Sequence, residues 1–126
     1  MQKESRIINL ERRLVRFAVS MIRTAESLPR TKAGNHVSGQ LIRCGTSPSS
    51  NYGEAQSAES RADFVHKMQV CLKELRETRA WLLIIDEAEL IKPASKLEPL
   101  LDESDELIAI FVKSVMTAKE KRKKTA

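Results

Sequence analysis

Turn-forming and aromatic residues are scarce in this 126-residue sequence, which has four Gly, four Pro and 4% aromatic residues. An all-β domain needs many turns, so the composition argues against one. Long apolar runs are also absent: none is longer than Ala80 to Ile85, which is far shorter than the about 20 residues that a membrane span requires. The remaining mixture, 41% hydrophobic and 31% charged residues, is typical of a folded domain and not of a disordered chain. We expect one mostly helical domain.

Cysteine is equally scarce. Cys44 and Cys71 are too few for a disulfide framework, and both fall inside apolar patterns. This favours a reducing compartment. The N-terminal segment MQKESRIINLERRLVRF carries charges throughout and has no apolar stretch before a cleavage site, so no signal peptide is expected. These features predict a cytoplasmic protein that does not associate with membranes.

Heptad spacing of apolar residues predicts helices along most of the chain. The first stripe starts at Ile7, continues through Leu14 and Met21, and ends before Pro29, which predicts a helix over 6–27. A second helix follows a short loop, with Asn35 or Ser38 as its cap.

Two further helices follow in the second half of the chain. Ser60 and Asp63 have capping-box spacing at the start of a stripe that predicts a helix over 60–89. The last stripe runs from Leu97 to Ala118, and Pro99 leaves the start of its helix open.

Short connections between four amphipathic helices favour antiparallel neighbours, so the predicted fold is an all-α, antiparallel, up-down-up-down four-helix bundle. It forms one domain over 1–118, followed by a basic tail over 119–126, with both termini at one end. The first and third helices also have second apolar edges, which either widen the core or form a subunit interface. These edges are Ile8, Val15 and Ile22 on the first helix and Val65, Leu72 and Leu83 on the third.

The segment GTSPSSNYG, residues 45–53, is ambiguous. Its Ser, Asn, Gly and Pro residues favour a loop by propensity. A helix that kinks at Pro48 and continues is equally compatible with the residues around it. Local sequence therefore leaves open whether the second helix stops here.

A longer pattern bears on this question. The runs QLIRCGTSPSSNYGE from Gln40 and ADFVHKMQVCLKELRETRAWLLII from Ala62 resemble the four-helix-bundle proteins encoded by intervening sequences of bacterial 23S ribosomal RNA genes. The matching residues are Gln40, Leu41, Arg43, Ser47, Asn51, Glu54, Asp63, Phe64, Glu74, Glu77 and Thr78. Cys44 departs from the serine usual in the family. The resemblance implies a bundle whose second helix continues, kinked, through Pro48, and a homopentameric assembly of uncharacterised activity for which nucleic-acid binding is the usual suggestion.

Several of these matching residues are charged or polar and lie near helix faces that point inward or toward a neighbouring subunit. A buried charge has to be paired, because an isolated one costs several kcal/mol. We therefore predict a structural polar seam in which Arg43 bridges Glu74 and Glu77, with Ser47, Asn51 and Glu54 completing it. The alternative is a ligand site built from the same residues.

Catalytic and metal-binding patterns are missing. Paired-metal bundles use Glu-x-x-His motifs, and this chain has none; Asp63 and His66 come nearest. Its two histidines fit no nucleophilic triad, and its glycines fit neither the P-loop nor the dinucleotide fingerprint. We expect no enzyme activity, no cofactor and no metal site.

Positive charge is concentrated at the two ends of the chain. Residues 1–32 carry eight basic and three acidic side chains, residues 119–126 carry five and one, and the segment between carries nine and thirteen. Arg12, Arg16 and Arg23 share a helix face opposite the apolar stripe, as charges on any solvated helix do. The same arginines, with Lys119, Lys121, Arg122, Lys123 and Lys124 as a flexible arm, form a candidate contact to a phosphate backbone. The one aromatic residue among them, Phe17, belongs to the apolar stripe, so no aromatic side chain is expected on the basic face to stack bases.

The sequence thus predicts a non-enzymatic bundle that self-assembles, with a homopentamer implied by the resemblance, and that binds RNA or DNA through its basic segments. The alternative is a purely structural scaffold or an adaptor for a protein partner, in which the basic surface serves solubility alone.

Overall fold

The computed structural model describes the backbone of residues 2–125 and the side chains of residue 5 and residues 9–123. The side chains of Ile7, Ile8 and Lys124, which belong to the predicted stripes and basic tail, lie outside the described residues. Four α-helices and one short 3₁₀ helix make up the fold, with no strand in the described part of the chain. They are α1 (Gln2–Glu26), α2 (Lys32–Gln56), α3 (Arg61–Glu87), η1 (Ala94–Lys96) and α4 (Glu98–Thr125).

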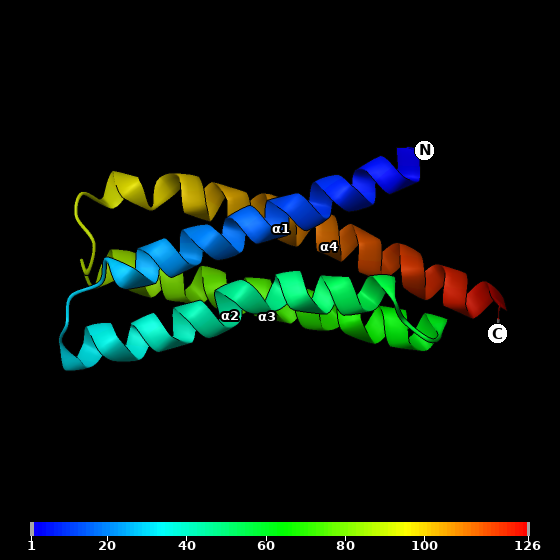
Figure 1. The fold of residues 1–126 in the computed structure, drawn as a ribbon, viewed down its shortest axis with the longest axis horizontal. Coiled ribbons are helices and arrows are strands. Elements are labelled where there is room, and N and C mark those ends of the chain that lie inside the picture. The colour runs from blue at the N-terminus through cyan, green and yellow to red at the C-terminus, as the bar shows by residue number, and fades with distance from the viewer. Residues whose placement is uncertain (1, 126) are drawn as a thin grey trace.

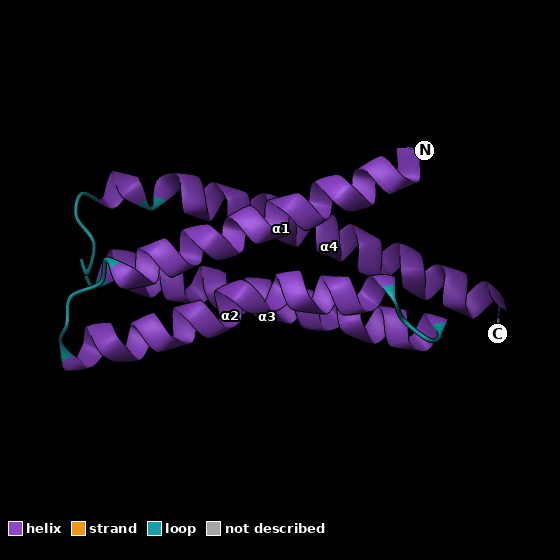
Figure 2. Ribbon diagram, in the orientation of Figure 1, coloured by secondary structure: helices purple, strands orange, loops and turns teal. Residues whose placement is uncertain are grey.

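The helices run alternately up and down with short connections at the two ends of the molecule (Figures 1 and 2). Helix α1 packs along α2, α2 along α3 and α3 along α4, whereas α1 and α4 contact each other only over a short stretch. Both chain ends lie at the same end of the bundle (Figure 1). The predicted all-α antiparallel four-helix bundle is confirmed.

The core is formed by the predicted apolar stripes. Leu14 and Met21 of α1, Leu75 of α3 and Phe111 of α4 are all buried in one hydrophobic cluster. Tyr52 of α2 points into the same cluster and packs edge-on against Phe111, with ring centroids 5.9 Å apart. Burying each large apolar side chain contributes about 1.5–3 kcal/mol, so these stripes supply most of the driving force for the fold.

The second apolar edges divide between core and surface. Val65 is buried and Leu72 packs against the core, so these two widen it. On α1, in contrast, Val15 is 46% exposed and Ile22 39% exposed, and Leu83 of α3 is also exposed. The α1 edge therefore does not belong to the core of the single chain.

The start of α2 corrects the predicted cap. Neither Asn35 nor Ser38 caps the helix; Thr31 does, because its Oγ1 accepts a hydrogen bond of 3.0 Å from the Gly34 amide. Gly34 is needed there, since a Cβ at this position would lie 1.8 Å from the Pro29 carbonyl oxygen. The helix thus begins immediately after the loop.

Helix α2 continues through Pro48 without a break, as the resemblance implies. Proline removes one amide donor from a helix, but here Pro48 is buried and its own carbonyl accepts a hydrogen bond from the Cys71 thiol of α3 at 3.5 Å. Contacts from the neighbouring helix, and not local propensity, keep this segment helical.

The start of α3 agrees with the predicted capping box. The Oγ of Ser60 accepts a hydrogen bond from the Asp63 amide at 3.0 Å, and the Asp63 carboxylate in turn accepts one from the Glu59 amide at 3.3 Å.

Helix α4 does not stop at Ala118, where its apolar stripe ends. It continues to Thr125, so the flexible arm expected over 119–126 is helical as far as the backbone is described.

Candidate nucleic-acid interface and polar seam

The three α1 arginines proposed for nucleic-acid contact all lie on the outer surface. Arg12, Arg16 and Arg23 are exposed, while Leu14 and Met21 on the opposite side of the helix are buried. No ion pair involving these arginines occurs among the described side chains. Their charges therefore face solvent.

Arg13, their neighbour in sequence, has a different role. It donates to Glu103 of α4 at 2.6 Å and to Glu106 at 3.5 Å. The hydrogen bond to Glu103 raises the pKa of the Arg13 guanidinium. This pair links α1 to α4 where the two helices otherwise make few contacts.

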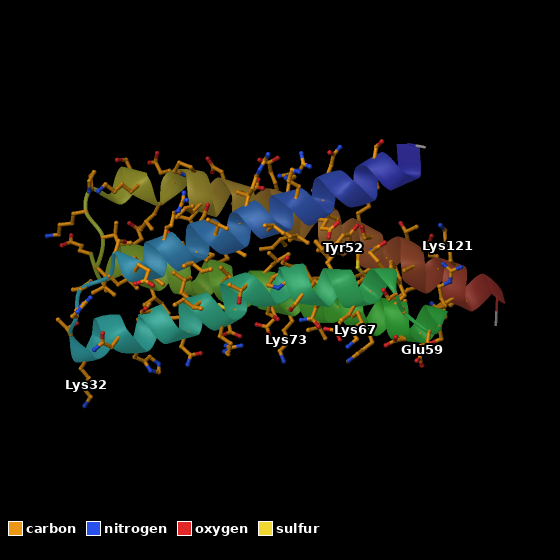
Figure 3. All side chains as sticks on the ribbon, in the orientation of Figure 1. Lys32, Tyr52, Glu59, Lys67, Lys73 and Lys121 are labelled. Atoms are coloured by element: carbon orange, nitrogen blue, oxygen red, sulfur yellow. The ribbon has the colours of Figure 1, made fainter. Side chains whose placement is uncertain are left out.

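The C-terminal end of α4 supplies the second basic segment. Lys119, Lys121, Arg122 and Lys123 are exposed on the last turns of the helix, and Lys121 is seen at that end of the bundle in Figure 3. Helix α4 is polarised along its length, since its first nine residues, 98–106, contain five acidic side chains and no basic one. This distribution also suits the helix dipole, which favours acids at the N-terminus and bases at the C-terminus.

The two basic segments form an interrupted surface. The α1 N-terminus and the α4 C-terminus lie at one end of the bundle (Figure 1), but Arg23 lies in the last turn of α1, at the opposite end. Arg12 and Arg23 are separated by about 16 Å along the helix axis at 1.5 Å per residue. An extended polyanion lying along α1 would reach all three arginines; a compact ligand would not.

The predicted polar seam lies along the junction of α2 and α3. Arg43 donates to Glu74 at 3.3 Å, to Gln40 at 3.2 Å, and to Glu77. Glu77 also accepts from the Trp81 indole at 3.2 Å. We call these five residues the Arg43 cluster. The Arg43 side chain is 51% exposed, so the single chain does not bury this charge and water shares in solvating it.

The remaining seam residues make separate contacts on the same junction. The Asn51 side-chain amide donates to the Ser47 carbonyl at 3.0 Å and to the Ser47 hydroxyl at 2.9 Å. Glu54 pairs with Lys67 of α3 at 3.0 Å and is not part of the Arg43 cluster. The seam is thus a row of surface contacts along the junction. At its end, Glu54 and Lys67 line an open pocket together with Ser50, Gly53, Ser57, Glu59 and Asp63.

Two contacts were not predicted from the sequence, one between α2 and α3 and one between α1 and α4. His36 packs edge-on against Trp81, with ring centroids 5.8 Å apart, and so extends the Arg43 cluster toward the start of α2. The Arg13–Glu103 pair was also missed, because its partners are 90 residues apart. The sequence did contain one signal for the indole hydrogen bond: Trp81 follows Glu77 by four positions, and residues four apart are neighbours on a helix surface.

Of Asp63 and His66, the nearest approach to a metal-binding pattern, His66 is exposed on α3 and Asp63 has a structural role. Asp63 caps α3 together with Ser60. Cys44 and Cys71 are both fully buried, and burial raises the pKa of the Cys71 thiol to about 12. Among the described residues no group of three His, Cys, Asp or Glu side chains is arranged to hold a metal ion.

Within the described part of the chain, no helix combines the length and apolar character needed to cross a membrane.

Comparison with known proteins agrees with this architecture. Residues 8–113 match the family model of the 23S rRNA-intervening sequence protein. The chain is also similar to a solved structure from Bacteroides thetaiotaomicron described as a protein with unknown function from the S23 ribosomal protein family. The two share 30% sequence identity and superpose with a TM-score of 0.78 over 84% of this chain and 97% of the other. No curated protein matches the sequence. The four-helix bundle and the match along most of its length show that this chain belongs to the 23S rRNA-intervening sequence protein family.

Proposed function

We propose that this protein is a non-enzymatic, self-assembling bundle that binds nucleic acid through the basic outer face of α1 and the basic C-terminal end of α4. The observation that carries the proposal is the contrast within α1. Arg12, Arg16 and Arg23 face solvent with no described ion-pair partner, whereas Arg13 is held by two carboxylates. A cytoplasmic location, where such partners are found, is part of the proposal.

The expected contact is with the phosphate backbone. Arginine pairs with phosphate through two parallel hydrogen bonds, and it does so independently of base sequence. Phe17, the one aromatic residue of the described basic segments, is buried in the core and offers no platform for base stacking. We therefore expect binding that tolerates many sequences and weakens strongly as salt rises.

The test is an electrophoretic mobility-shift titration with one duplex DNA and one hairpin RNA at two salt concentrations. Changing Arg12, Arg16 and Arg23 together to Gln should weaken binding at low salt. It should also reduce the slope of log affinity against log salt by about two to three, the slope expected for three phosphate contacts. Absence of binding by the unchanged protein at low salt would reject the proposal.

A matched control removes the same charge from another surface. Lys32, Lys73 and Arg76 are exposed and belong neither to α1 nor to the C-terminal end of α4. Lys32 and Lys73 project from the edge of the bundle formed by α2 and α3 in Figure 3. Their combined replacement by Gln should leave most of the affinity intact. Equal losses in both triple variants would indicate attraction by net charge alone.

The self-assembly part is supported by the apolar side chains that the single chain leaves exposed on α1, Val15, Val19 and Ile22. Light scattering of the purified protein measures the assembled mass. The family resemblance implies five copies, and this number is a prediction that light scattering tests.

A second candidate function is a scaffold or adaptor that binds a protein partner. The exposed apolar residues Ile84 and Met116, on helices other than α1, favour this alternative. The two functions are distinguished by the mobility-shift titration: a protein that assembles normally but binds neither the DNA nor the RNA supports the scaffold or adaptor.

A further inference from the structure

The last two turns of α3 are apolar on both their inner and their outer sides. Leu82 and Ile85 point into the core and are fully buried. Leu83 and Ile84, which lie between them in the sequence, point outward and are 38% and 44% exposed. A helix that is apolar all round is normally covered all round. The single chain therefore covers only one side of a segment whose composition suits burial on both.

Trp81 and Ala80 complete this outer apolar surface. Ile84 follows Ala80 by four positions and Trp81 by three, and side chains at these spacings are neighbours on a helix. The Trp81 indole is held by its hydrogen bond of 3.2 Å to Glu77 and by its edge-on contact with His36. Tryptophan is enriched at the centres of protein interfaces, and a ring that is already held loses little freedom on binding. We call Ala80, Trp81, Leu83 and Ile84 the Trp81 patch.

The segment that contains the patch is strongly acidic. Residues 77–106 carry nine acidic and three basic side chains, whereas the whole chain has a net charge of +5. Glu87 is exposed and follows Ile84 by three positions, so it borders the patch directly. Two exposed basic residues lie at other margins, Arg76 one turn before Ala80 and Lys32 at the start of α2.

A second acid reaches the patch from α4. The Arg79–Asp105 ion pair, 2.6 Å long, fixes how the antiparallel helices α3 and α4 are aligned. Asp102 lies about one turn before Asp105, and Leu83 about one turn after Arg79, so Asp102 and Leu83 come level with each other. Asp102 is exposed, and neither it nor Glu87 belongs to an ion pair among the described side chains. Both carboxylates can therefore pair with a cation from outside the chain.

The acids in the last turn of α3 lie where the dipole of the helix disfavours them. A helix C-terminus carries partial negative charge and favours basic residues. The last turn of α3 contains Asp86 and Glu87 and no basic residue. Neither acid forms an ion pair within the described part of the chain. This arrangement is unfavourable in the single chain, and cations supplied by a partner would relieve it.

The Trp81 patch and the basic face of α1 point in different directions. Helix α1 packs on α2 and briefly on α4, and α3 packs on the same two helices, so α1 and α3 lie diagonally across the bundle. The patch also lies at the end of the bundle where α4 begins, opposite the end with both chain termini (Figure 1). A polyanion on α1 or on the basic end of α4 would therefore leave the patch free.

A second copy of α1 carries apolar and cationic side chains, but these lie at a different level of the bundle. Met21 of α1 lies against Gly45 of α2, and the nearby Pro48 contacts Cys71 of α3. The exposed apolar side chains of α1 are therefore level with the middle of α3, about 15 Å from the patch at the usual helix rise. Cyclic symmetry about an axis along the bundle brings equal levels together. A ring of five built in this way leaves the Trp81 patch uncovered.

We propose that the Trp81 patch binds a cationic amphipathic helix of a protein partner. Apolar side chains of that helix cover Trp81, Leu83 and Ile84. Its Lys or Arg residues pair with Glu87 and Asp102 and offset the dipole of α3. The inference goes beyond the proposed function, because it adds a protein-binding surface that acts whether or not nucleic acid binds. With both surfaces occupied, the bundle holds a basic protein beside a nucleic acid.

A synthetic peptide tests the patch through the fluorescence of Trp81, the only tryptophan in the chain. The probe is a helix of about four turns without aromatic residues, with Leu on one face and Lys on the other. Without nucleic acid present, its binding should shift Trp81 emission to shorter wavelength, because the ring loses contact with water. Two control peptides, one with the same residues scrambled and one with Glu in place of Lys, should bind at least about tenfold more weakly.

An apolar substitution locates the binding site on α3. Ile84→Gln should weaken binding of the cationic peptide at least about tenfold, because it places a polar group at the centre of the contact. Met116→Gln is the matched control, since Met116 is an exposed apolar residue of α4 outside the patch. It should bind the peptide as the wild-type protein does. Circular dichroism checks that both variants remain helical.

A second pair of variants tests the charges. Glu87→Gln combined with Asp102→Asn should weaken binding about tenfold, the loss expected for two exposed ion pairs. Glu59→Gln combined with Glu120→Gln removes the same charge from exposed positions at the end of the bundle that carries the chain termini. This control should change the affinity less than about twofold.

The outcomes separate this inference from the proposed function. No emission shift with the cationic peptide, or equal binding by the scrambled or acidic peptide or by the Ile84→Gln protein, overturns it. If sedimentation shows that Ile84→Gln lowers the assembled mass, a second copy covers the patch; the inference is then wrong and self-assembly stands. A wild-type protein that binds the cationic peptide but shifts neither DNA nor RNA supports the inference and rejects nucleic-acid binding.

Discussion

Gly45 of α2 lies directly against Met21 of α1: a Cβ built on Gly45 would be 2.5 Å from the Met21 Cγ and 2.6 Å from its Cβ. Both residues are buried at the centre of the α1–α2 contact. The absence of a side chain at position 45 lets the two helices approach this closely.

We expect Gly45→Ala to destabilise the fold by about 1–3 kcal/mol, since an extra methyl group in a packed core forces side chains to move. Alanine favours the helix by up to about 1 kcal/mol relative to glycine, which offsets part of this loss. Met21→Ala should be destabilising on its own, by about 2–5 kcal/mol, because it leaves a cavity. Urea denaturation measures both.

The double variant provides the control for this steric explanation. Met21→Ala removes the Cγ but keeps the Cβ, so the methyl group of Gly45→Ala loses one of its two close contacts and keeps the other. The second substitution should therefore cost less in the double variant than alone, but should still destabilise. Additive losses would show that the contact with the Met21 Cγ is not what requires glycine at position 45.

The Arg13–Glu103 pair should contribute modestly to closing the bundle. Both side chains are about one-third exposed, so the coupling free energy expected from a double-mutant cycle is about 0.2–1 kcal/mol. It should shrink as salt is raised, because partly exposed ion pairs are screened. The cycle uses Arg13→Met and Glu103→Gln; a coupling unaffected by salt would contradict the electrostatic explanation.

The Arg43 cluster can be followed through Trp81, the only tryptophan in the chain. Arg43→Met removes the cation that positions Glu77, which accepts the indole hydrogen bond. We expect a lower melting temperature and a shift in tryptophan emission. Lys73→Met, an exposed change on α3, the helix of Glu77 and Trp81, involves no described ion pair and should alter neither. If the Arg43 and Lys73 variants behave alike, the structural seam interpretation is wrong.

The buried thiol of Cys71 predicts a pH dependence. Burial raises its pKa from 9.0 to about 12, so the folded chain keeps the proton at pH values where the unfolded chain loses it. The stability that this group contributes is complete below the unfolded pKa and falls as pH rises from about 9 toward 12. Cys71→Ala should have a flatter stability profile in this range. In the native protein at pH 8, Cys71 should react with thiol reagents only on unfolding.

The sequence was sufficient to predict the helices whose apolar stripes follow a heptad, because residues such as Leu14, Leu75 and Phe111 are selected by burial on one face. It was insufficient around Pro48, where Ser, Gly and Pro favour a loop and contacts from α3 override that preference. The Thr31 cap was missed because Asn35 and Ser38 are equally good caps by residue type.

The candidate sites were predictable to a smaller extent. Patterning identified the outward arginines of α1, since their spacing places them opposite the apolar stripe. It could not show that Arg13 pairs with a residue 90 positions away or that Arg43 is half exposed. Both depend on how the helices pack, which periodicity within one helix does not specify.

The short contact between α1 and α4 makes the first and last helices the outer members of an open series, each held mainly by one neighbour. Helices α2 and α3 are each held on two sides. Local opening should therefore begin at α1 and α4, and amide hydrogen exchange should be fastest there and slowest in the middle of α2 and α3. Assembly or ligand binding on α1 would slow exchange first where the single chain is least protected.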